Sequence, residues 1–89
     1  MVGFAIEAAS SLALSPDPDV RLVAASNPNT PARVLAELAN DDSVRVRLAL
    51  VCNPNTPAVT ICRLVADSDA EVAADANHAI NEVAVRKEY

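Results

Sequence analysis

The 89-residue sequence has a single glycine, one phenylalanine, one tyrosine and no tryptophan, so aromatic residues make up only 2% of it. It also lacks runs in which polar and apolar residues alternate. Because a β-sandwich or β-barrel needs many turns and alternating strands, these absences argue against an all-β fold. What remains is 52% hydrophobic, which is too apolar for a disordered chain, and is punctuated by six prolines. This composition predicts short helices that pack closely in one small domain.

Cysteine and histidine are equally scarce. Two cysteines, Cys52 and Cys62, are too few for a disulfide framework, an iron–sulfur cluster or a structural zinc site, so we expect no cofactor and no metal. Free cysteines are usually buried, and small residues occupy the corresponding repeat positions, which favours packed thiols over a redox pair. The only histidine, His78, lies in no recognisable catalytic or metal-binding motif. We interpret it as a surface or half-buried structural residue.

The charge balance is acidic. Twelve acidic residues against seven basic ones give a net charge of −5 and an isoelectric point near 4.5, which argues against a general affinity for polyanions. The apolar stretch at residues 1–14 is preceded by no basic residue and is too short to span a bilayer. These features predict a soluble cytoplasmic protein without membrane contact.

The dominant feature of the sequence is an internal repeat. The segment Asn27-Pro28-Asn29-Thr30-Pro31-Ala32 recurs letter for letter 26 residues later, at residues 53–58. At the same offset residues 20–22 match residues 46–48, Leu38 matches Leu64, and Asp41 matches Asp67. Repetition at a fixed period of this length is the signature of a solenoid. We divide the single domain 1–89 into a half repeat at 1–15, repeats at 16–41 and 42–67, and a terminal half repeat or cap at 68–89.

Each repeat contains signals for two helices. Asp17, Ser43 and Asp69 share one repeat position and are good N-caps, while Asn27 and Asn53 precede prolines and can end a helix in the left-handed conformation. Thr30 and Thr56 are the expected caps of the second helices. The predicted helices cover residues 2–14, 18–26, 31–39, 44–52, 57–66 and 70–87. Their expected apolar stripes contain Val34, Leu35, Leu38 and Ala39 in one repeat, Thr60, Ile61, Leu64 and Val65 in the next, and Val72, Ala76, Ile80 and Val83 in the last helix.

The two ends of the chain differ from each other. Asp75 falls at the repeat position of Val23 and Ala49, which we take as a buried position that has become polar in a terminal cap. The first helix has Glu7 as its only charge. A helix that is apolar on nearly every side is usually covered by a partner, so we expect self-association, such as a homodimer. The candidate residues for this contact are Phe4, Ile6 and Leu12.

The stretch from Asp17 to Pro31, DPDVRLVAASNPNTP, resembles the leucine-rich repeat variant family, and the tail VLAELAND at residues 34–41 continues the resemblance. The similarity is clear over residues 16–67. It implies an all-α fold, a short right-handed α-solenoid of about three 26-residue repeats with two helices each. The best-known relative holds an iron–sulfur cluster on a separate cysteine-rich segment that this chain lacks. The family has no shared catalytic residues.

Arginine and asparagine form the most suggestive polar patterns. Arg21 and Arg47 are equivalent in the repeat and predict a ladder across adjacent helices, with Arg45 beside them. They can bind a partner, or they can pair with neighbouring aspartates as part of the fold, and we favour the structural interpretation. Asn29 and Asn55 have the same two interpretations. These five residues are the candidate partner-binding residues.

Three classes of function follow. A non-catalytic protein–protein interaction module, acting as an adaptor, inhibitor or assembly subunit, comes first, because solenoids present extended surfaces and no catalytic set is visible. A nucleic-acid-binding solenoid of the HEAT-like kind, using Arg21, Arg45 and Arg47, is the alternative; the acidic charge and the lack of aromatic residues count against it. An enzyme is the least supported class.

Overall fold

A computed structural model of the chain describes residues 10–87, with side chains through residue 82. The described part is all helical: residues 10–13 are helical, and five helices follow. Most of the helix predicted at 2–14 lies outside the described residues. These are α2 (Pro18–Ser26), α3 (Ala32–Leu38), α4 (Val44–Cys52), α5 (Ala58–Leu64) and α6 (Ala70–Lys87). Three of the predicted ranges, 18–26, 44–52 and 70–87, are confirmed. The helices predicted at 31–39 and 57–66 are shorter at both ends.

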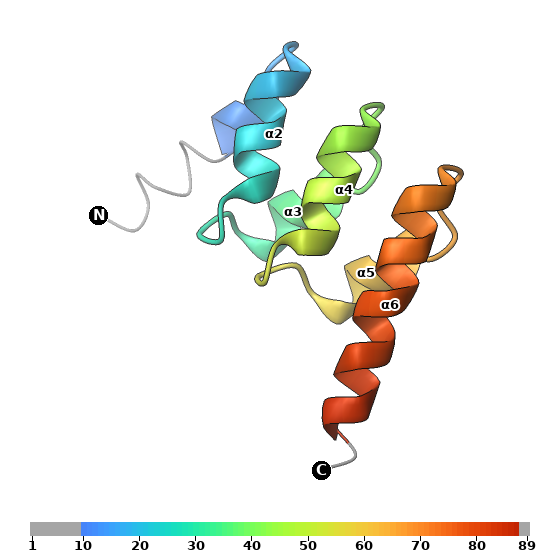
Figure 1. The fold of residues 1–89 in the computed structure, drawn as a ribbon. Coiled ribbons are helices and arrows are strands. Elements are labelled where there is room, and N and C mark those ends of the chain that lie inside the picture. The colour runs from blue at the N-terminus through green and yellow to red at the C-terminus, as the bar shows by residue number, and fades with distance from the viewer. Residues whose placement is uncertain (1–9, 88–89) are drawn as a thin grey trace.

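The helices stack as repeated pairs (Figure 1). Helices α2, α4 and α6 lie side by side in one layer, and the shorter α3 and α5 lie behind them. Helix α4 packs against α2 on one side and α6 on the other, while α5 packs against α6. The result is a thin slab of 38 × 29 × 14 Å.

The hydrophobic core runs between the two layers. It is built from repeat-equivalent positions, so that Val46 and Val72 share one position, and Ala24, Leu50 and Ala76 share another. Leu38 and Leu64 are both buried, as their equivalence predicts. Leu12 and Ala13, just before the first full repeat, pack against this core and are partly buried.

The first-layer helices begin at the predicted caps. The Asp17 carboxylate accepts from the Asp19 backbone N–H, the Ser43 hydroxyl accepts from Val46, and the Asp69 carboxylate accepts from residues 71 and 72. Pro18 occupies the first turn of α2, where a missing N–H leaves no hydrogen bond unmade. The local sequence therefore determines where the helices of this layer begin.

Two predicted turn details are wrong. Asn27 and Asn53 end their helices with extended backbone, at φ −82° and −79°, and no described residue has a positive φ. The following prolines, which exclude helical backbone in the residue before them, explain this conformation. Thr30 does not cap α3 either, because Pro31 is the N-cap residue and the Thr30 hydroxyl instead donates to the Ala24 carbonyl at 2.7 Å.

Two packing expectations are also wrong. Val65, placed in the apolar stripe of the fifth helix, lies in the turn after α5 and is 37% exposed. Val23 is 55% exposed and Ala49 is only partly buried, so the position that they share with Asp75 is not a buried one. A polar residue at Asp75 is therefore no sign of a cap. Of the predicted stripe of α6, Val72 and Ala76 are buried and Ile80 is partly buried, while the side chain of Val83 lies outside the described residues.

Candidate functional site

The arginine ladder forms two equivalent clamps. Arg21 donates from Nε and Nη2 to the two carboxylate oxygens of Asp41, at 2.7 and 3.1 Å, and from Nη1 to the Ser15 carbonyl at 2.8 Å. Arg47 repeats this geometry with Asp67 at 2.8 and 3.2 Å and with the Asp41 carbonyl at 2.6 Å. Each clamp therefore ties together the chain segments that precede two successive first-layer helices.

The clamp side chains are largely buried, at 12–17% exposure for the arginines and 6–7% for the aspartates. Burial opposes ionisation of Asp41. Its pKa is nevertheless below its usual value, because the carboxylate accepts hydrogen bonds from Arg21 and the Ser43 backbone and lies near the positive charges of arginines. The pKa of Asp67 is lowered against burial in the same way, by Arg47 and the Asp69 backbone. The hydrogen bond to Asp41 raises the pKa of Arg21 despite desolvation. The carboxylates of Asp41 and Asp67 are thus ionised at neutral pH.

Arg45 is different from the other two arginines. Its guanidinium and the Asp19 carboxylate are 3.5 Å apart and both side chains are more than 70% exposed. Of the three ladder arginines, only Arg45 presents most of its side chain to solvent.

The asparagines form a second ladder, which joins the turns between layers. The Asn55 side-chain amide donates to the Thr30 carbonyl at 2.8 Å. Asn53 was predicted only to end a helix. Its side chain is 5% exposed, and its amide donates to the Ala25 and Asn27 carbonyls at 2.8 and 3.0 Å. Asn29 is exposed, and its backbone N–H donates to the Asn27 side chain. The recurrence of the asparagine at the repeat period was the signal that could have identified Asn53.

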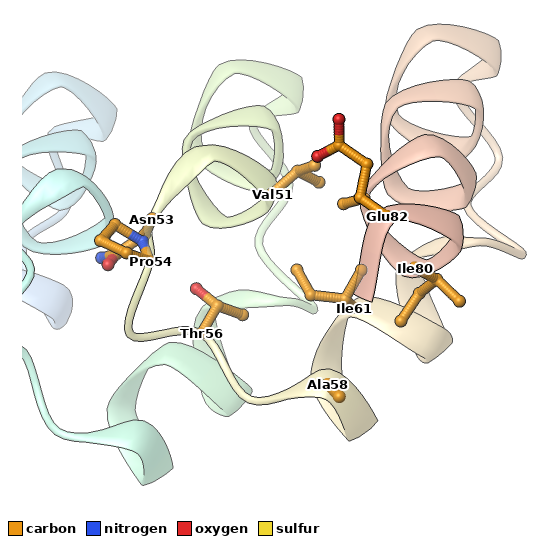
Figure 2. Close-up of a pocket in the computed structure, with 9 residues that line it drawn as sticks. Val51, Asn53, Pro54, Thr56, Ala58, Ile61, Ile80 and Glu82 are labelled. Carbon is orange, nitrogen blue, oxygen red and sulfur yellow. The ribbon is translucent and has the colours of Figure 1, made fainter. Parts of the chain in front are cut away.

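A pocket of about 280 Å³ opens where this asparagine ladder ends (Figure 2). The loop after α4 forms one wall and α6 the other, with Ile61 of α5 between them. The lining residues are Val51, Asn53, Pro54, Thr56, Ala58, Ile61, Ala79, Ile80 and Glu82. The Thr56 hydroxyl is buried here and makes no hydrogen bond with any described residue. Nothing in the repeat pattern of the sequence predicted this pocket.

The remaining candidates are scattered. Cys52 and Cys62 are both exposed free thiols, so the expectation of packed thiols is wrong; the helix faces that carry them point to solvent. His78 is exposed, as expected, and its Nε2 lies 3.2 Å from a Glu82 carboxylate oxygen. Phe4 and Ile6 lie outside the described residues, and Leu12 is partly buried. Among residues 10–82 no group of three possible ligands for a metal ion comes together.

None of the described helices combines the length and the apolar character that crossing a bilayer requires.

One part of the chain matches a known protein family. The family model described as leucine rich repeat variant matches residues 18–43, which span α2, α3 and the turn that leads into α4. No curated protein and no solved structure matches the chain. The helix pair that begins at residue 18 thus matches the repeat of the leucine rich repeat variant family, as the resemblance in the sequence indicated.

Proposed function

We propose that this chain is a non-catalytic protein-interaction module, acting as an adaptor, an inhibitor or a subunit of an assembly. The observation that carries the proposal is the thinness of the stack. At 14 Å in its smallest dimension, it leaves one face of each helical layer open to solvent. Stacked helical repeats use such broad faces to bind other proteins.

Large aliphatic side chains lie on these open surfaces. Val23 of α2 is 55% exposed, Val59 of α5 is 70% exposed, and Leu14 before α2 is 81% exposed. Single exposed aliphatic residues are common on any protein, but at the centre of an interface they supply the buried apolar area. Val23 and Val59 lie in different layers, so they report separately on the two faces.

The test is quantitative capture of partners by tagged protein from the native host. Val23→Asp or Val59→Asp should reduce a captured partner by about ten-fold, because an unpaired charge buried in an interface costs at least 1–3 kcal/mol. Ala70→Asp is the matched control, since it adds the same charge at an exposed position in the first turn of α6, where acidic residues are favourable. Equal capture by all four proteins would rule out both faces as binding surfaces.

The alternative function, nucleic-acid binding, has little support from the arginine contacts. Arg21 and Arg47 already donate to carboxylates and backbone carbonyls, which weighs against a phosphate-binding ladder. Arg45 alone cannot offset a net charge of −5. A salt-dependent electrophoretic shift with DNA or RNA would reverse this judgement.

A second copy of the chain is one partner that fits the proposal. The apolar sequence at residues 2–14 motivates it, with Phe4, Ile6 and Leu12 as the candidate contacts. Light scattering over a dilution series should show a concentration-dependent mass that Phe4→Asp abolishes. A constant monomer mass for both proteins would exclude self-association. The two free thiols fit a reducing compartment such as the cytoplasm.

A further inference from the structure

The asparagine ladder shows how one turn binds the next. The turn of residues 53–56 sits against the preceding turn, with the Asn53 amide donating to the carbonyls of Ala25 and Asn27 and the Asn55 amide donating to that of Thr30. In these bonds a side-chain carboxamide donates to backbone carbonyls, so the contact depends on the amide group of asparagine. The repeat contact is therefore a template for asparagine recognition.

One repeat later, different residues stand at the positions that make this contact. Ala79, Ile80 and Glu82 stand 26 residues after Asn53, Pro54 and Thr56. Without the proline α6 continues as a helix, and without the asparagine it has no carboxamide at this position. The acceptor equivalent to the Ala25 carbonyl is the Val51 carbonyl, which accepts no hydrogen bond within the described part of the chain. All of these residues except Ala25 line the 280 Å³ pocket (Figure 2).

Thr56 gives an independent indication that a partner belongs in this pocket. The equivalent hydroxyl, that of Thr30, donates to the Ala24 carbonyl at 2.7 Å. The Thr56 hydroxyl is equally hidden from solvent but has no hydrogen-bond partner among the described residues. Buried polar atoms without partners are rare in native proteins, and each calls for a specific cause. Because this oxygen is closed to solvent, a bound group can satisfy it only if the side chains around it move when the ligand enters.

The walls of the pocket select among ligands. Ala58, Ile61 and Ile80 offer an apolar surface that suits a proline ring or an aliphatic side chain. The Val51 carbonyl is free to accept from a donor, and the Glu82 carboxylate in the lining repels anions. A neutral carboxamide satisfies these conditions, whereas the isosteric carboxylate of aspartate does not. The volume accommodates a short turn rather than an isolated side chain.

We propose that the pocket between the loop after α4 and the second half of α6 binds an asparagine-proline turn of a partner polypeptide. The asparagine carboxamide donates to the Val51 carbonyl, and the proline packs on Ile61 and Ile80. This inference rests on the proposed function, because the ligand is a segment of a partner protein. It identifies the chemistry that one part of the surface recognises.

The probe is the blocked peptide acetyl-Ser-Asn-Pro-Asn-Thr-Pro-amide, which has the sequence of residues 26–31. Titrated into isotopically labelled protein, it should shift the amide resonances of Thr56, Ala58 and Ile80. The control peptide carries aspartate in place of both asparagines. It should bind about ten-fold more weakly or less, because a carboxylate facing the Val51 carbonyl leaves both groups unsatisfied. Equal affinity of the two peptides, or no shift with either at millimolar concentration, would overturn the proposal.

Two variants locate the binding. Ala79→Asn places a side chain of this chain in the pocket, and Thr56→Val removes the hydroxyl while keeping the shape. Each should weaken peptide binding by several-fold, while circular dichroism and the resonances of α2 remain unchanged. Full affinity in both folded variants would contradict the proposed location. If neither peptide binds while Val59→Asp still reduces partner capture, the pocket proposal fails and the interaction module stands.

Discussion

Arg47 shows how much one side chain holds in place. It joins Asp67, which precedes α6, to the Asp41 carbonyl, which precedes α4, and its side chain is only 12% exposed. A bidentate pair of this kind fixes both distance and orientation between neighbouring helices. Lysine could not reproduce it, because an ammonium lacks the planar fork of donors.

Arg47→Met should therefore reduce the free energy of unfolding by about 3–5 kcal/mol, because it leaves the buried Asp67 charge without a partner. Arg45→Ala is the control: it removes an exposed pair and should cost less than about 1 kcal/mol. Urea unfolding followed by circular dichroism measures both. Similar costs for the two variants would show that the clamp does not hold the stack together.

The lowered pKa values of Asp41 and Asp67 predict acid sensitivity. Each carboxylate stabilises the fold while ionised, so its contribution is complete above the unfolded pKa of about 3.9 and is lost as pH falls through the lower folded value. The free energy of unfolding of the wild type should fall steeply below about pH 4. Asp67→Asn should be less stable at neutral pH, with a shallower dependence on acid. Parallel stability curves for the two proteins would contradict this assignment.

The two equivalent threonines differ in one hydrogen bond. Thr30→Val removes the bond to the Ala24 carbonyl and should cost about 0.5–1.5 kcal/mol. Thr56→Val removes a hydroxyl that has no partner among the described residues, and should be neutral or stabilising. Thermal unfolding of the pair provides the comparison. Equal destabilisation would mean that the Thr56 hydroxyl is satisfied in solution.

At the scale of the helices, the same repeat positions are buried in successive repeats. Leu64 of α5 is 2% exposed, and its equivalent Leu38 is 4% exposed. Leu64→Ala should reduce the free energy of unfolding by about 2–5 kcal/mol, since it removes buried methyl groups and leaves a cavity. Val65→Ala, one residue later and 37% exposed, should cost distinctly less. Denaturant titration of both variants tests which residues form the core, and a reversed order would place it elsewhere.

The helix boundaries show what local sequence can predict. The caps of the first layer follow from Asp17, Ser43 and Asp69, because their oxygens can reach only the backbone of the next turn. The role of Thr30 could not be predicted in this way. A hydroxyl can accept from its own helix or donate to a neighbouring one, and only the packed structure decides between them. Local chemistry thus predicts the starts of three helices and fails at the turns between layers.

For the molecule as a whole, the 26-residue period was sufficient to predict an all-helical stack of pairs. The orientation of Cys52 and Cys62 and the burial of Asn53 were not predictable from it. These depend on which face of each short helix meets a neighbour, and an alanine-rich helix has several faces of similar hydrophobicity. The pocket was missed because it arises from a difference between repeats, at Ala79 and Ile80, rather than from the repeat itself.

The span of the ladders along the chain has a consequence for folding kinetics and for redesign. Among the described residues, the side-chain hydrogen bond with the largest sequence separation runs from Asn53 to Ala25, 28 positions apart. The Arg–Asp pairs of the clamps are 20 positions apart. Since no such bond requires distant parts of the chain to meet, folding can start in either repeat and propagate to the other, which favours rapid folding. For the same reason, a further copy of residues 42–67 inserted after residue 67 would supply its own clamp and its own asparagine turn. The molecule can therefore be lengthened in steps of 26 residues without redesigning either end.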